Sequence, residues 1–147
     1  MALPSPWLYV ATAEARDSEM AERVAVHQGR RGPSWTTVET PRDIAGALAA
    51  NANTPALVDC LTLWLSNVLL ADADVDAEIE HLEGALARAA APIVLVANEV
   101  GSGIVPDSAL GRRFRDLQGL LNQRMAARAD RVFLVVAGLP LALKGSP

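Results

Sequence analysis

Residues 55–97 read PALVDCLTLWLSNVLLADADVDAEIEHLEGALARAAAPIVLVA, and the fold class follows from them. This segment begins with a short apolar run at residues 55–60 and ends with a second one at residues 92–97. Between the two runs, residues 61–70 are almost wholly apolar, and residues 75–90 repeat apolar side chains at helical spacing. Short apolar runs are typical of buried strands, and a period of about 3.6 residues is typical of helices. The segment therefore predicts two buried strands joined by two helices.

The same alternation of apolar runs and helical periods extends to both sides. Strands that alternate with helices favour an α/β fold with a mostly parallel sheet. The flanking strands are predicted at Trp7–Ala11 and residues 131–137, and the flanking helices at residues 17–28 and Asp107–Arg128. The last helix is the longest, and Asp107 is its predicted cap. Its predicted core face consists of Leu110, Phe114, Leu117, Leu121 and Met125.

The segment between the first strand and residue 55 is predicted to be a loop followed by a helix. Residues 29–40 are rich in Arg, Gly and Pro, which is typical of a loop. Thr40 has the side chain of a helix cap, Pro41 suits a first helical turn, and Asp43 lies where the acid of a capping box is expected. The sequence therefore predicts a helix that starts at Thr40.

Composition and charge argue against several classes of protein. The chain has 147 residues, of which 51% are hydrophobic and 20% charged, as in a globular domain. Its net charge is -4 and its only lysine is Lys144. Nucleic-acid binding calls for clustered Lys and Arg, so no nucleic-acid partner is predicted.

The chain is predicted to be cytoplasmic and to have no membrane span. Its most apolar stretch, residues 56–70, is too short to cross a bilayer and carries Asp59. The segment before Trp7 has no Lys or Arg, unlike the start of a signal peptide. Cys60 is the only cysteine, which excludes an intrachain disulfide and favours a buried thiol in a reducing compartment.

Polar side chains follow three of the predicted strands. Thr12, Asp59, and Asn98 with Glu99 each lie at or just after the end of an apolar run. Ligands of open parallel sheets bind at the carboxyl ends of the strands, so these residues predict a site at one edge. Asp59 has two readings of equal weight: it holds Mg²⁺, as acids at strand ends of nucleotide-binding folds do, or it caps the next helix.

His27 closes the predicted helix at residues 17–28 and precedes Arg30 and Arg31. On pattern alone, the favoured reading is a helix-terminal histidine held against the core or near the helix dipole. The alternative is a nucleophile that attacks phosphorus while the two guanidinium groups neutralise phosphate oxygens.

Several segments together resemble one enzyme family, the bifunctional adenosylcobinamide kinase/adenosylcobinamide-phosphate guanylyltransferases. The match covers nearly the whole chain in order, and its most specific parts are the Asn-Glu-Val-Gly block and the Phe-Arg-Asp and Asn-Gln-Arg blocks. The matching segments are residues 9–13, 17–23 with His27, 35–41, 57–67, 94–101, 103–116 and 122–130.

This resemblance implies a RecA-like P-loop fold, usually assembled as a homotrimer. It implies phosphorylation of adenosylcobinamide by GTP or ATP, with Mg²⁺ as the expected cofactor. It also implies GMP transfer from GTP to adenosylcobinamide phosphate through a GMP–histidine intermediate, which releases pyrophosphate. His27 stands at the position of that histidine. The nucleotide-contacting positions of the family match Ala11, Thr12, Ala13, Gln28, Gly29, Arg30, Arg31, Glu39 and Asp59.

The chain departs from the family in one respect. The family begins with a strand and a Gly-x-x-x-x-Gly-Lys-[Ser/Thr] loop, and this motif is absent from the sequence. We therefore predict a single nucleotide-binding domain, residues 1–147, that lacks the first strand, the P-loop and the first helix. The first strand sits centrally in the family's sheet, so its loss is predicted to expose strand edges. The alternative is an impaired homologue that acts as a nucleotide-binding or oligomer subunit, and the 147-residue chain alone is expected to be weakly active.

Overall fold

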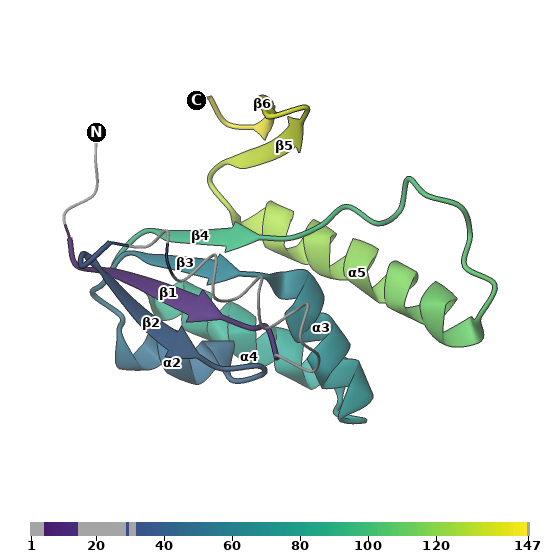
Figure 1. Ribbon diagram of the computed structural model, residues 1–147, viewed down its shortest axis with the longest axis horizontal. Coiled ribbons are helices and arrows are strands. Elements are labelled where there is room, and N and C mark those ends of the chain that lie inside the picture. Colours follow the sequence, from purple (N-terminus) through teal and green to yellow (C-terminus); the bar gives the residue numbers. More distant parts are fainter. Residues whose placement is uncertain (1–4, 15–28, 30–31, 147) are drawn as a thin grey trace. The chain divides into compact units, whose positions relative to one another are not determined.

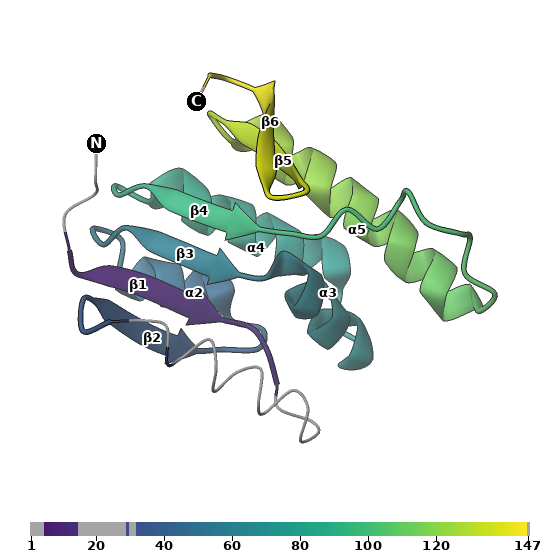
Figure 2. The ribbon, with the colours of Figure 1, turned by 45° about the horizontal axis from the view of Figure 1, so that its top comes forward.

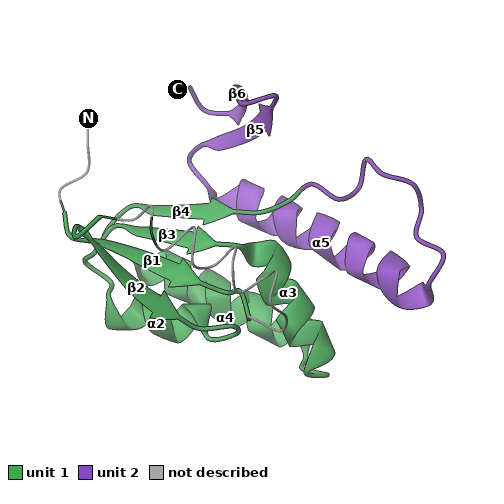
Figure 3. Cartoon of the chain, viewed as in Figure 1, with its two compact units in different colours: residues 1–98 green, residues 99–147 purple. Residues whose placement is uncertain are grey.

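The computed structural model describes residues 5–14, 29 and 32–146. The chain divides into two compact units, one that runs to Asn98 and one that begins at Glu99 (Figure 3). The prediction of a single domain over residues 1–147 stays a prediction.

The first unit contains a four-stranded parallel sheet. Ala11 lies beside Glu39 on one neighbouring strand and beside Asp59 on the other, and Asp59 lies beside Val96. The last residues of all four strands are therefore in register at one edge of the sheet. The predicted α/β class with a mostly parallel sheet is confirmed. In spatial order the strands are β2 (Trp35–Glu39), β1 (Trp7–Ala11), β3 (Ala56–Asp59) and β4 (Ile93–Val96).

Strand β2 corrects the sequence-based prediction, which made residues 29–40 a loop. Its five residues, Trp-Thr-Thr-Val-Glu, pair with β1 over their whole length. They include an aromatic and three β-branched side chains, which fit a pleated surface. The segment lacks a continuous apolar run because it is an edge strand: Thr36, Thr37 and Glu39 are all exposed.

Helices α2 and α4 lie along one face of this sheet, and α3 begins beyond the carboxyl end of β3 (Figures 1 and 2). The core of the unit comes from the sheet residues on that face and from the helix residues packed against them, including Leu8, Val10, Val58, Ile44, Leu65, Ile79 and Leu82. The helices are α2 (Ile44–Ala50), α3 (Leu61–Leu70) and α4 (Val75–Arg88), so the predicted helix at residues 61–70 is confirmed to the residue.

Helix α2 starts later than predicted, because Asp43 rather than Thr40 is its N-cap. The Asp43 carboxylate accepts a hydrogen bond from the Gly46 amide at 2.7 Å. The Thr40 hydroxyl oxygen accepts one from the Asp43 amide at 3.1 Å. The polar side chains that suggested a cap at Thr40 therefore form a turn before the helix, and Pro41 lies in that turn rather than in the helix.

The opposite face of the sheet carries Trp7, Tyr9 and Trp35 and the exposed valines of β4. Trp35 contacts both other rings, with centroid distances of 5.2 Å to Trp7 and 6.1 Å to Tyr9. Val94 and Val96 are 53% and 38% exposed. Strand β4 pairs with β3 on one side, and no strand within the described ranges pairs with its other side. The sheet thus has an apolar free edge at β4.

The second unit consists of helix α5 (Ala109–Arg128) and a two-stranded antiparallel sheet of β5 (Val132–Val136) and β6 (Leu139–Lys144). The helix cap is Ser108, one residue after the predicted Asp107, and its hydroxyl accepts a hydrogen bond from the Gly111 amide. Of the predicted core stripe, Leu121 and Met125 are buried, whereas Leu110 is 57% exposed.

Strand β6 is absent from the sequence-based prediction. Ala137 and Gly138 join the two strands and have φ values of 52° and 77°. Two consecutive positive φ values are typical of the tight turn of a two-residue hairpin. Lys144, at the end of β6, donates hydrogen bonds to the carbonyls of Ala126 and Ala127 at 3.1 and 2.9 Å. The only lysine therefore ties β6 to the last turn of α5, where a cation is favourable.

Across the ranges that the structure describes, no helix has the length and apolar character needed to cross a membrane.

Candidate functional site

Thr12 joins the carboxyl ends of β1 and β3. Its side chain is fully buried, and the hydroxyl donates a hydrogen bond to the Cys60 carbonyl at 2.7 Å. The same oxygen accepts one from the Cys60 amide at 2.8 Å, while the Thr12 amide donates to the Asp59 carbonyl at 3.1 Å. Thr12 thus contributes to the edge of the sheet by fixing the backbone that carries Asp59.

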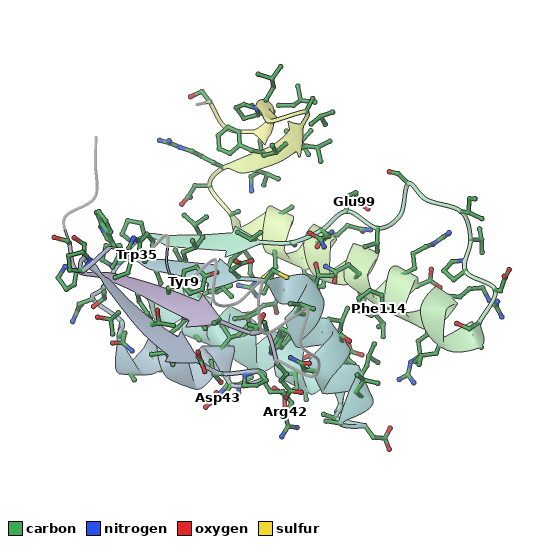
Figure 4. All side chains as sticks on the ribbon, in the orientation of Figure 1. Tyr9, Trp35, Arg42, Asp43, Glu99 and Phe114 are labelled. Atoms are coloured by element: carbon green, nitrogen blue, oxygen red, sulfur yellow. The ribbon has the colours of Figure 1, made fainter. Side chains whose placement is uncertain are left out.

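Asp59 is oriented by Tyr9. The tyrosine hydroxyl, on the neighbouring strand, donates a hydrogen bond to Asp59 Oδ2. Figure 4 labels Tyr9 on β1 and Trp35 on the neighbouring strand β2. The N-cap of α3 is Cys60 rather than Asp59, and the Cys60 side chain makes no capping hydrogen bond. The reading of Asp59 as a helix cap is therefore wrong, and its carboxylate stands at the strand end as a partly exposed group.

Three side chains of helix α3 form hydrogen bonds at the same carboxyl edge of the sheet. The Thr62 hydroxyl oxygen accepts a hydrogen bond from the Asn98 amide at 2.8 Å, at the end of β4. Trp64 Nε1 donates to the Arg42 carbonyl at 2.7 Å. Asn67 Nδ2 donates to the carbonyls of Thr12 and Pro41. Thr12, Asp59 and Asn98 thus lie at one edge of the sheet, where α3 holds them, whereas Glu99 belongs to the second unit; the ligand site predicted there stays a prediction.

Of the remaining described residues of the predicted nucleotide site, all but Gly29 lie at or next to the same strand ends. Ala11 is the last residue of β1, and Glu39, the last residue of β2, is beside it and exposed. Ala13 follows Thr12 and is half-buried, and Gly29 is exposed. The pairing thus brings Ala11, Glu39 and Asp59 together side by side.

His27, Gln28, Arg30 and Arg31 lie outside the described residues. Their predicted roles as nucleophile and nucleotide contacts stay predictions.

The loop after β4 forms a turn of its own in the second unit. Glu99 Oε1 accepts a hydrogen bond from the Gly101 amide at 3.0 Å, and Asn122 Nδ2 donates to Glu99 Oε2 at 3.4 Å. Gln118 Nε2 donates to Asn122 Oδ1 at 2.8 Å. The Asn-Glu-Val-Gly and Asn-Gln-Arg blocks, which are distant in sequence, are therefore connected by their side chains.

Sequence reasoning missed Tyr9, Thr62, Trp64 and Asn67. A signal existed for Asn67, which stands among apolar residues in α3 and is buried. A buried side-chain amide must find hydrogen-bond partners, so such a residue indicates a polar contact. No signal in the sequence names those partners, because they are backbone carbonyls of other segments.

The sequence is similar to proteins of known family. The model of the family described as cobinamide kinase / cobinamide phosphate guanyltransferase matches residues 1–143. A bifunctional adenosylcobalamin biosynthesis protein, CobP, of Pseudomonas aeruginosa is 48% identical over 143 residues, which are 95% of this chain and 83% of that protein. The bifunctional adenosylcobalamin biosynthesis protein CobU of Escherichia coli is 40% identical over 154 aligned positions, which cover 93% of this chain and 85% of that protein. Its namesake in Salmonella typhimurium is 38% identical with the same coverage.

Proposed function

The chain belongs to the cobinamide kinase / cobinamide phosphate guanyltransferase family, and from this premise we propose that it acts in cobalamin biosynthesis as a bifunctional enzyme. It phosphorylates adenosylcobinamide with GTP or ATP and transfers GMP from GTP to adenosylcobinamide phosphate. The match over residues 1–143 favours the enzyme over a non-catalytic subunit.

One observation carries this proposal: Ala11, Glu39 and Asp59 lie side by side at the carboxyl ends of three parallel strands. These residues match nucleotide-contacting positions of the family, and ligands of open parallel sheets bind at this end. The buried hydrogen bonds of Thr12 support it, because they hold the backbone at this edge rigidly before any ligand arrives.

The proposed GMP transfer proceeds in two displacements. An unprotonated His27 nitrogen attacks the α-phosphorus of GTP, so a nitrogen–phosphorus bond forms while the bond to the bridging oxygen breaks and pyrophosphate leaves. A phosphate oxygen of adenosylcobinamide phosphate then attacks the same phosphorus. The bond to His27 breaks, adenosylcobinamide-GDP is released, and the histidine is regenerated. Arg30 and Arg31 would neutralise the phosphate oxygens.

Asp59 is the proposed ligand of Mg²⁺. No group of three or more His, Cys, Asp or Glu residues that could hold a metal occurs within the described part of the chain. Magnesium needs no such cage, since it keeps several waters and takes one or two carboxylates together with substrate phosphates. The Asp59 carboxylate, oriented through Oδ2 by Tyr9, fits that requirement. The metal would supply neutralisation of charge on the nucleotide phosphates.

A RecA-like P-loop fold and a homotrimer, which the resemblance implies, complete the proposal together with a cytoplasmic location, which the single cysteine Cys60 favours. Within the described residues β4 pairs only with β3, so its other backbone edge is open to a further strand.

The proposal is tested by mixing the protein with GTP radiolabelled in the α-phosphate and then adding adenosylcobinamide phosphate. We expect the label to appear on the protein first and to pass to the corrinoid within a single turnover. GTP radiolabelled in the γ-phosphate serves as the control and should leave no label on the protein. Binding of GTP without any transfer would support the subunit alternative instead.

Replacing Asp59 by Asn should raise the Mg²⁺ concentration for half-maximal GMP labelling at least about tenfold, because a charged ligand becomes neutral. Replacing Tyr9 by Phe should raise it by about fivefold, since the carboxylate stays but loses its orienting hydrogen bond. Asp72, an exposed residue, gives the matched control Asp72→Asn. An unchanged magnesium dependence in Asp59→Asn would show that this carboxylate does not bind the metal.

A further inference from the structure

One buried amide connects the segments that leave two neighbouring strands. The Asn67 side chain is 8% exposed. Its Nδ2 donates a hydrogen bond to the Thr12 carbonyl at 2.9 Å and another to the Pro41 carbonyl at 3.0 Å. Thr12 follows β1, and Pro41 lies in the loop after β2. A single side-chain amide therefore bridges these two segments.

We propose that Asn67 is a positioning residue for the nucleotide site, which holds the ends of β1 and β2 at the spacing that the nucleotide requires. Ala13 directly follows one anchored carbonyl, and Glu39 lies two residues before the other. Both residues match nucleotide-contacting positions of the family. The expected change in affinity for GTP rests on the proposed function, whereas the anchoring of the two segments by Asn67 does not.

The chemistry of the contact explains why an asparagine stands here. A primary amide has two N–H hydrogens in a fixed plane, so one nitrogen can satisfy two carbonyls at once. A hydroxyl has one hydrogen, and a carboxylate has none. Because the side chain is buried, water does not readily replace a lost donor, and each carbonyl would lose its partner in the interior.

Other hydrogen bonds also connect the loop that contains Pro41 to α3 and to the end of β1. Trp64 Nε1 holds the Arg42 carbonyl, one residue beyond Pro41. The Thr40 amide donates to the Ala11 carbonyl at 2.9 Å and continues the ladder between the two strands. Asn67 adds the contact that reaches both strand ends from a third element.

The test compares three variants of the full 147-residue chain. Asn67→Asp keeps the shape but removes both donor hydrogens, and Asn67→Leu removes the polar group without adding charge. Asn51→Asp is the matched control, because the Asn51 amide also donates to a backbone carbonyl, that of Ala47 in its own helix, away from the strand ends. The readouts are amide hydrogen exchange at Thr12 and Thr40, whose amides donate to the carbonyls of Asp59 and Ala11, and the Kd for GTP with Mg²⁺.

In both Asn67 variants we expect exchange at these amides to become at least about tenfold faster and the Kd for GTP to rise roughly tenfold, because the carbonyls of Thr12 and Pro41 lose their buried donor. Asn51→Asp should change neither. Acidification from about pH 8 to about pH 6 should restore part of the affinity in Asn67→Asp, since a protonated carboxyl regains one donor, but not in Asn67→Leu. An equal response of the two variants to pH would show that the donor hydrogens of residue 67 do not set the affinity for GTP.

The possible outcomes distinguish a failure of the positioning role of Asn67 from a failure of the proposed function. Unchanged exchange in both Asn67 variants overturns the positioning role, whatever happens to GTP. Faster exchange with an unchanged Kd for GTP also overturns it. If the unmodified chain does not bind GTP while exchange responds as expected, the proposed function fails and the anchoring of the two segments stands.

Discussion

His27→Ala should abolish labelling of the protein by α-labelled GTP and lower GMP transfer at least about 10³-fold, because the nucleophile that accepts GMP is gone. Phosphorylation of adenosylcobinamide should persist in this variant, since the proposed kinase step does not pass through the histidine. The measurement is a single-turnover assay of both reactions on the same protein preparation. In the unmodified chain, the label should be lost in acid and kept in alkali, as expected of a nitrogen–phosphorus bond.

The chain offers a matched control for this experiment. His81, the only other histidine, is exposed on helix α4. His81→Ala should be labelled at the rate of the unmodified chain. Persistent labelling of His27→Ala would refute the assignment and would point to another nucleophile. Loss of both the kinase and the transferase reactions would indicate that His27 supports nucleotide binding rather than covalent transfer.

Thr12→Val should lower the free energy of unfolding by about 2 to 4 kcal/mol. Valine has nearly the shape of threonine, so the packing is kept, but the Cys60 amide and carbonyl both lose the hydroxyl that satisfies them. Leaving a buried polar group without a partner costs about 1 to 3 kcal/mol, and two groups are affected here. Urea unfolding measures the effect as a lower midpoint with an unchanged m value.

Two further variants isolate the hydroxyl. Thr12→Ser keeps it and should cost only about 1 kcal/mol, for the loss of one buried methyl group. Thr36→Val makes the same chemical change at an exposed position of β2 and should stay within about 0.5 kcal/mol of the unmodified chain. Equal stability of Thr12→Val and Thr36→Val would show that the Cys60 backbone is satisfied in another way.

Apolar segments with a clear period could be predicted from the sequence. Trp7–Ala11 and the helix at residues 61–70 were located to the residue, because apolar runs or periods have sharp ends there. Strand β2 was missed because an edge strand keeps polar side chains. Strand β6 was missed because Gly138 and Pro140 look like the end of regular structure, although Gly138 belongs to a hairpin turn.

The candidate site was predictable only in outline. The positions of Thr12, Asp59 and Asn98 at strand ends were visible in the sequence, and parallel pairing brought them together. The partners of Asp59 and Thr12 were not visible, because Tyr9 and Cys60 lie 50 and 48 residues away. Which side chains meet across such distances depends on strand order and register, and the local pattern of residues does not encode these.

The hydrogen bonds from α3 also bear on how the protein is made. Asn67 reaches back 55 residues to Thr12, and Thr62 reaches forward 36 residues to Asn98. A nascent chain on the ribosome therefore lacks the last of these contacts until Asn98 has left the exit tunnel. We expect strand β1, which is translated before α3, to remain without its Asn67 anchor until residue 67 has left the tunnel, and the end of β4 to be fixed only after Asn98 follows.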